Sequence, residues 1–307
     1  MPPAESGRLK SAANWGTPFY FDNMDGTSQT GNDSEYIPVG NVHDLEIDGD
    51  HMYLAVGDWD SGELVIMDIS GPSPSTTRVY GEGNYTNVVV LNGSYIYLSH
   101  GAGENNFEIV QISSIDPLTL EQKGTCTLET DFGGLVYIND IAVSGTYAFA
   151  ATSSGGLYII DIDLTNPENP RIVGNFKDYN TDIVPGGVIR NIQSVAVKGT
   201  TAYLVSYLKG AVNDTWLKVI DINDVNNPFE EAAIPLETPT HKVLVKGNNL
   251  LVSEGNSVIT LFNIDITDQK NLKKIGSCGT GGGARDIIIE NNIVYAVFDD
   301  GSVRVIN

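Results

Sequence analysis

The sequence predicts an all-β fold of six repeated sheets, and three observations lead to this prediction. A short apolar run occurs six times, in copies that start at residues 64, 107, 157, 217, 259 and 303. In each repeat a turn residue, Gly or Asn, precedes an aromatic residue or Leu by four positions, as Gly145 precedes Phe149. The runs start 42 to 60 residues apart, which is the length of four short strands with their turns. We therefore expect a six-bladed β-propeller of four-stranded antiparallel blades.

Each repeat divides into strands in the same order. The first two strands meet at the glycine, because a two-residue hairpin turn needs a positive φ angle. The apolar run is the third strand, and a turn rich in Pro and Asn separates it from the fourth, as at 166–170. The expected blades lie at about 42–80, 86–127, 138–177, 189–235, 240–278 and 284–307.

The last repeat ends with its third strand, so its fourth strand must come from elsewhere in the chain. Residues 7–14 resemble the fourth strand of the third repeat in their basic and apolar start. We predict that residues 7–14 pair with 303–307 and close the ring, which makes 1–307 a single domain with a long loop at 15–41. A closed ring leaves no sheet at an exposed end of the stack.

Composition and charge narrow the classes of partner. The 307 residues carry 39 acidic against 17 basic side chains, and their net charge of −22 would repel a nucleic-acid backbone. No apolar run reaches about 18 residues, so no transmembrane helix is expected. The chain starts without a basic region or a long apolar one, so no signal peptide is expected in this sequence. We expect a monomer that binds a protein or a carbohydrate.

A row of polar residues stands six positions before the turn residues and should surround one mouth of a central channel. The row consists of His43, Asn87, Asn139, Gln193, His241 and Arg285. The next position adds three carboxylates, Asp44, Asp140 and Asp286. Such a funnel could hold an anion, a sugar or a metal ion. Alternatively, these side chains bond backbone groups where the strands start, or hold channel water.

Aromatic residues in the loops are the second group of candidates. Loops that join successive blades and loops that join second to third strands share one face of a propeller, and here they are long. They contain Trp15, Tyr36, Trp59, Tyr179 and Trp216. Flat rings beside Asn and Asp suit sugar or protein recognition. Alternatively, these rings pack the loops onto the blades.

No cofactor is firmly implied, and no catalytic residue is assigned. The sequence has no nucleophile signature, and its histidines lack metal-binding spacing. Calcium or another divalent cation remains an option for oxygen-rich loops such as 22–26. The acidic ends of the third strands, Asp68, Asp161 and Asp221, should cap the turns that follow them.

Two segments resemble the LVIVD-repeat family of β-propellers. Residues 285–289 with 294–297 resemble the first half of its repeat, and 156–162 with 166–167 and 170–174 resemble the second half. Repeats two and four depart from the pattern, because Val88 and Ser194 replace the acidic residue. The resemblance implies a secreted or surface-anchored protein.

The expected function is therefore an extracellular or cell-surface recognition scaffold that binds a protein or a glycan through its loop-rich face. It would not be an enzyme. The alternative is a hydrolase or lyase with a site at the channel mouth, with or without a metal ion, because propellers of this size host such enzymes.

Overall fold

The computed structural model describes most residues after position 40 and divides the chain into two compact units, 1–125 and 126–307. The described residues are 41–57, 62–70, 75–81, 85–101, 103–115, 118–131, 133–163, 165, 167–180, 188–208, 214–236, 238, 240–254, 258–264, 268, 271–279, 284–290, 293–298 and 303–306. They form strands and turns and no helix, so the expected all-β class is confirmed. Accordingly, nothing in the described ranges is a helix of the length and apolar character that a bilayer crossing needs.

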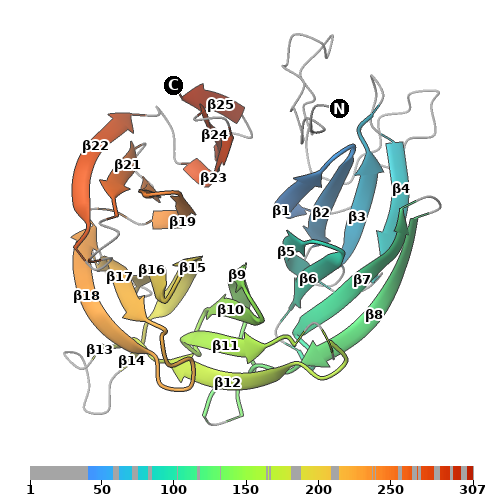
Figure 1. The fold of residues 1–307 in the computed structure, drawn as a ribbon, viewed down its shortest axis with the longest axis horizontal. Helices are drawn as coiled ribbons and strands as arrows, with labels where there is room; N and C mark the ends of the chain where they lie inside the picture. Colours follow the sequence, from blue (N-terminus) through green and yellow to red (C-terminus); the bar gives the residue numbers. More distant parts are fainter. Residues whose placement is uncertain are drawn as a thin grey trace. The chain divides into compact units, whose positions relative to one another are not determined.

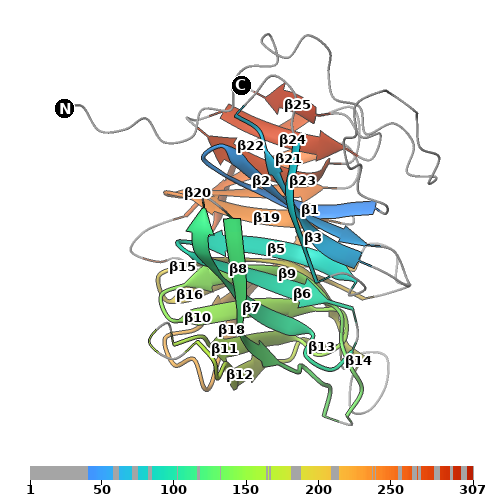
Figure 2. The same cartoon turned by 90° about the vertical axis from the view of Figure 1, so that its right-hand side faces the viewer.

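The first unit holds two four-stranded antiparallel sheets whose strands pair in chain order (Figures 1 and 2). The first sheet comprises β1 (Asn41–Asp48), β2 (His51–Gly57), β3 (Gly62–Asp68) and β4 (Ser75–Tyr80). The second comprises β5 (Thr86–Asn92), β6 (Tyr95–His100), β7 (Phe107–Ile115) and β8 (Leu118–Cys126), which ends at the unit boundary.

The second unit repeats this order in three more four-stranded sheets. They comprise β9 (Ile138–Ser144), β10 (Tyr147–Thr152), β11 (Leu157–Asp161) and β12 (Arg171–Phe176); β15 (Asn191–Lys198), β16 (Thr201–Tyr207), β17 (Thr215–Asp221) and β18 (Phe229–Leu236); and β19 (Thr240–Lys246), β20 (Asn249–Glu254), β21 (Val258–Asn263) and β22 (Lys273–Gly279). A hairpin of β13 (Tyr179–Asn180) and β14 (Val188–Ile189) joins the first two sheets. The first strands β9, β15 and β19 lie side by side (Figure 1).

A sheet of three described strands ends the chain: β23 (Ala284–Glu290), β24 (Ile293–Phe298) and β25 (Val303–Ile306). Its first strand lies beside β19. The predicted closing strand 7–14 and the predicted loop 15–41 lie outside the described residues.

Local sequence rules explain the hairpins. Gly49, Gly93, Gly145, Gly199 and Gly247 have φ angles between 58° and 62°, as the predicted turns require. All six apolar runs form third strands, which confirms that part of the repeat. Their side chains pack between neighbouring sheets. Leu217 and Val219 of β17, for example, share a buried cluster with Val243 and Val252 of the next sheet. The core therefore consists of apolar layers between sheets, and each layer needs both neighbours.

Candidate functional site

The predicted polar row has a structural basis that the sequence did not reveal: each member is the extra residue of a β-bulge. In all six sheets the pairing of the first strand with the second shifts by one residue. The residues skipped by the shifts are His43, Asn87, Asn139, Gln193, His241 and Arg285. A bulge leaves its extra residue outside the ladder and turns its side chain away from the regular alternation. Polar side chains suit this position because they can bond nearby backbone groups.

Two members of the row show what such a side chain does. The Nε2 atom of His43 lies 3.0 Å from the carbonyl oxygen of Gly57, and its ring centroid lies 5.0 Å from that of Tyr85. Asn139 donates from Nδ2 to the backbone oxygen of Ile192 at 2.8 Å and to Oδ1 of Asn191 at 3.1 Å. His43 thus folds back on its own sheet, whereas Asn139 connects its sheet to the next.

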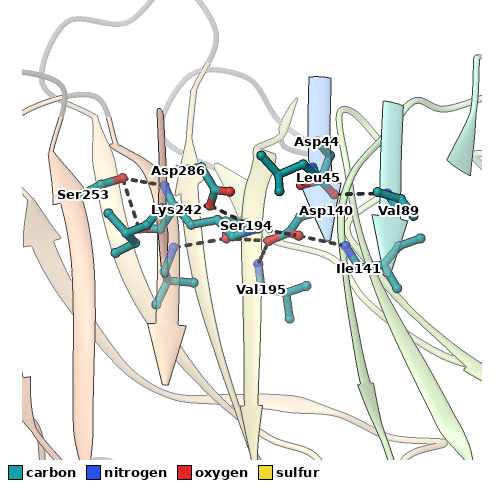
Figure 3. Close-up of polar contacts among 12 residues, drawn as sticks. Asp44, Leu45, Val89, Asp140, Ile141, Ser194, Val195, Lys242, Ser253 and Asp286 are labelled. Carbon is teal, nitrogen blue, oxygen red and sulfur yellow. Dashed lines mark hydrogen bonds and ion pairs between the residues drawn. The ribbon is translucent and has the colours of Figure 1, made fainter. Parts of the chain in front are cut away.

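After three of the six bulges, the next residue connects neighbouring sheets in the same way (Figure 3). Asp44 accepts a hydrogen bond from the backbone N–H of Val89 at 3.0 Å, in the next sheet of its unit. Asp140 accepts from the N–H of Val195 at 3.0 Å, and Ser194 accepts from the N–H of Val243 at 3.1 Å. In all three cases the donor is the backbone N–H one residue after the equivalent position of the next sheet.

These aspartates also bond their own strands. Oδ1 accepts from the next backbone N–H in Asp44 (3.0 Å), Asp140 (3.0 Å) and Asp286 (2.8 Å). Each carboxylate thereby satisfies a backbone donor that the bulge removes from the regular ladder. The expectation that this row bonds backbone groups at the strand starts is supported for Asp44, Asp140 and Asp286.

Lys242, on β19 of the fifth sheet, replaces the acceptor and reverses the charge (Figure 3). Its Nζ donates to Oδ1 of Asp140 at 3.1 Å and lies 3.8 Å from Oδ1 of Asp286. Asp140 also accepts from the Ser194 hydroxyl at 2.5 Å, so it has four donors while its side chain is only 6% exposed. Within the second unit, this cluster joins the first strands of four sheets. Among the described residues, no three His, Cys, Asp or Glu side chains gather closely enough to hold a metal ion.

The sequence analysis missed a second polar row, at the second position of four of the apolar runs. It consists of Glu108, Tyr158, Lys218 and Thr260. Each member is buried and bonded: Glu108 to Tyr80 at 2.8 Å, Tyr158 to the Glu129 carbonyl at 2.5 Å, Lys218 to Asp178 at 3.0 Å and Thr260 to Glu254 at 2.5 Å. The sequence does carry a signal for this row, because one column of the six aligned apolar runs contains Glu, Lys, Thr and Arg.

Trp216 was predicted to lie in a loop, and the structure corrects this placement. It is the second residue of β17, where it pairs with Ser206 across the ladder. Its indole N–H donates to Oδ1 of Asp214 at 2.6 Å, and its ring lies 5.8 Å from Nζ of Lys218 and 6.0 Å from the guanidinium of Arg190. These contacts give Trp216 a packing role, because the ring covers a buried ionic cluster.

Tyr179 is exposed, whereas Trp15, Tyr36 and Trp59 lie outside the described residues. Tyr179 is 45% exposed in β13, and two further large side chains, Leu135 and Tyr137, are 38% and 42% exposed before β9. An ion pair between Lys177 and Asp131 ties the two loop segments together. We call Leu135, Tyr137 and Tyr179 the loop patch.

The acidic ends of three third strands cap turns, as predicted. The carboxylates of Asp68, Asp161 and Asp221 accept from the backbone N–H two residues on, at 2.8, 3.2 and 2.7 Å. Hydrogen bonds from Ser70 lower the pKa of Asp68 below its usual value.

Comparisons with solved structures identify the fold and nothing more specific. A protein from Lactobacillus plantarum is 13% identical, with 87% of this chain and 84% of that chain covered and a TM-score of 0.65. A chain of a mitotic checkpoint complex is 12% identical, with 87% and 74% covered and a TM-score of 0.58. A candidate 6-phosphogluconolactonase from Bacteroides fragilis is 15% identical, with 86% and 79% covered and a TM-score of 0.58. No curated protein matches the sequence.

The repeat itself is matched directly. Residues 39–77 and 137–178 match the model of the LVIVD repeat. These segments cover the first sheet of each unit, in which Asp44 and Asp140 form the same pair of backbone hydrogen bonds. Two segments of the chain therefore match the LVIVD repeat, within a β-propeller-like, all-β fold.

Proposed function

We propose that this protein is an extracellular or cell-surface recognition scaffold that binds a protein or a glycan through its long loops. The observation that carries the proposal is the loop patch. Seven large apolar side chains are exposed in the described residues, and three of them, Leu135, Tyr137 and Tyr179, lie on two loop segments that contact each other. Exposed apolar groups that gather at one place favour an interaction site over chance exposure.

The loop that carries Leu135 and Tyr137 is ordered before any ligand binds. Its ends pair at the bridge between Glu129 and Leu135, and the N–H of Thr130 donates to the carbonyl of Gly134 at 2.7 Å. The hydroxyl of Tyr158 holds the Glu129 carbonyl from below at 2.5 Å. Tyr137 exchanges hydrogen bonds with Ser153 at 2.9 and 3.2 Å. A preformed loop lowers the entropy lost on binding, which suits recognition.

The proposal is tested by binding the purified protein to a glycan array and to an array of extracellular proteins. The Tyr137→Ala, Tyr179→Ala double variant should lose at least about tenfold in affinity for any ligand found, since exposed tyrosines often dominate binding. Phe229→Ala is the matched control, because Phe229 is 54% exposed on β18 of the same unit. Wild-type protein that binds nothing on either array, or a double variant that binds as wild type, would contradict the proposal.

The alternative, a hydrolase or lyase with a site at the mouth of the predicted central channel, with or without a metal ion, has weaker support. A general acid or base needs a carboxylate that can reach a substrate. Asp44, Asp140 and Asp286 already accept backbone N–H groups. Asp140 also accepts from Lys242 and is nearly fully buried. The Bacteroides fragilis structure shares only the fold at 15% identity, and fold alone does not carry activity.

We also propose that the six repeats close into one ring. The support is the last sheet, whose three described strands lack the outer strand present in the other five sheets. Residues 7–14 would supply that strand to β25. Deletion of residues 1–14 should then sharply lower the melting temperature, and a truncated chain that melts like the full one would exclude closure by this segment.

Fractionation of the native source tests the proposed location outside the cell.

A further inference from the structure

The first unit contains a polar pocket that the sequence analysis did not predict. It has a volume of about 260 Å³ and lies where β6 ends, β7 begins and β8 passes beside them. Its lining consists of His100, Glu104, Asn105, Glu108, Gln122 and Thr125. All six side chains are polar, two are carboxylates and none is a lysine or an arginine.

Glu108 is the buried anion of this pocket. It is 4% exposed and accepts three hydrogen bonds, from the Tyr80 hydroxyl at 2.8 Å, from His100 Nε2 at 2.7 Å and from Gln122 Nε2 at 2.5 Å. Burial alone would raise the pKa of Glu108, but the hydrogen bonds from His100, Gln122 and Tyr80 outweigh it and hold the pKa below its usual value. The carboxylate is therefore charged and held in place at neutral pH.

His100 supplies a second feature that calls for a physical explanation. Because an ionised carboxylate only accepts, Nε2 of His100 must carry the proton that it shares with Glu108. The other ring nitrogen, Nδ1, is buried and makes no hydrogen bond within the described part of the chain. An unsatisfied buried nitrogen is costly, and such atoms often mark a site where water or a ligand binds.

The hydrogen-bonding capacity left in the pocket is mainly of the acceptor type. Oε2 of Glu108 has one donor and can take a second, and Gln122 keeps its carbonyl oxygen. Glu104, at the exposed end of the lining, forms no ion pair with any described residue. By contrast, the Thr125 hydroxyl already donates to Asn105 at 3.0 Å. A ligand that offers only N–H donors and a positive charge would match these groups.

We propose that this pocket binds a small organic cation, an ammonium or guanidinium group carried on a short carbon chain. The volume agrees with this size, because drug-sized ligands need roughly 300–1,000 Å³. The net charge of −22 would further raise the local concentration of cations. The inference concerns a different unit from the loop patch, so either proposal can fail without the other.

Titration with n-butylammonium and n-butylguanidinium, followed by nuclear magnetic resonance, tests the proposal. The chemical-shift changes caused by both cations should reach saturation, whereas the neutral n-butanol should cause no saturable change. Glu104→Gln should weaken binding about two- to fivefold, as expected for an exposed ion pair, and Glu108→Gln by more than about tenfold. Because Glu104 is exposed, its variant should fold normally.

Glu254→Gln is the matched control. Glu254 is 6% exposed in the second unit and accepts from the Thr260 hydroxyl at 2.5 Å, so the variant removes a buried carboxylate without touching the pocket. It should bind both cations as wild type does.

A blocked tripeptide with a central arginine separates the two sources of the ligand. If the tripeptide binds more tightly than n-butylguanidinium, the natural ligand is a peptide side chain. If it binds more weakly, the natural ligand is a free small-molecule cation.

Three results would overturn the proposal. The first is equal binding of n-butanol and n-butylammonium, and the second is unchanged binding by both Glu104→Gln and Glu108→Gln. The third is displacement of the cations by calcium at lower concentration, which would make the pocket a metal site.

Discussion

Glu108 in the first unit and Lys218 in the second occupy the same place in their sheets, the second position of the apolar run, with opposite charges. Lys218 forms ion pairs with Asp178 at 3.0 Å and Glu230 at 2.7 Å, and Asp178 also accepts from the Ser206 hydroxyl at 2.6 Å. Glu108 has only uncharged or titratable donors and borders an open pocket. This position can thus carry a buried charge of either sign, and the side chains around it match that charge.

The two surroundings imply different costs of disruption. Lys218 pairs with two carboxylates, and the side chain of one of them, Asp178, is only 4% exposed. Two of the partners of Glu108, His100 and Gln122, line the open pocket. Loss of a charge should therefore be more harmful in the second unit than in the first.

The largest expected effect is that of Lys218→Ala. It leaves Asp178 with Arg190 at 3.8 Å as its remaining cation, so the free energy of unfolding should fall by about 3–5 kcal/mol. Urea denaturation measures this change. Lys198→Ala is the control, because Lys198 forms exposed hydrogen bonds and should cost at most about 1 kcal/mol. Equal costs for the two variants would show that the buried pair is unimportant.

Glu108→Gln should have the next largest effect, about 1–3 kcal/mol. The amide keeps an acceptor for one donor but loses the charge that attracts His100. Urea denaturation under the same conditions gives the comparison. If the two variants Glu108→Gln and Lys218→Ala lower the free energy of unfolding equally, the open pocket does not reduce the cost of losing a charge. The contrast between the two units would then be wrong.

Tyr158→Phe tests a neutral member of the same row. Its hydroxyl donates to the Glu129 carbonyl, and burial raises the pKa of Tyr158 to about 12. Loss of this bond should cost about 0.5–1.5 kcal/mol. The control is Tyr97→Phe, because the Tyr97 hydroxyl is buried and makes no hydrogen bond in the described residues. That variant should be neutral or stabilising in thermal unfolding.

The smallest expected effect is on the pH dependence of stability. Wild type and Glu108→Gln differ by one carboxyl group among 39 acidic residues. The folded pKa of Glu108 lies below its unfolded value, so the group stabilises the fold above the unfolded pKa. This contribution is lost as pH falls through the folded pKa. The gap in stability between wild type and Glu108→Gln should therefore narrow from pH 7 towards acid, and a constant gap would refute the assigned charge.

Features set by local rules could be predicted from the sequence. A glycine four residues before an aromatic residue specifies a two-residue turn, and Gly49 and Gly199 adopt the required positive φ. The third strands followed from their apolar runs, and the Asp68 cap followed from its place before a turn. These interactions involve residues close in sequence, so spacing alone is informative.

Features that depend on distant partners could not be predicted in the same way. Spacing identified the row from His43 to Arg285 but could not show a bulge, which depends on how the second strand pairs. Likewise, the partners of Asp140 lie 54 to 102 residues away, at Ser194 and Lys242. Trp216 was misplaced because the boundary between a loop and a strand depends on its pairing with Ser206.

The bulge with its following acceptor also bears on how such a chain could lengthen or shorten. Asp44, Asp140 and Ser194 each belong to one repeat and accept a hydrogen bond from the main chain of the repeat that follows. A duplicated repeat would bring its own acceptor, and this hydrogen bond would need only a backbone N–H from the neighbouring repeat. Whole repeats could then be inserted or deleted as units. The side chain on each bulge could also vary, because no pairing in the ladder depends on it.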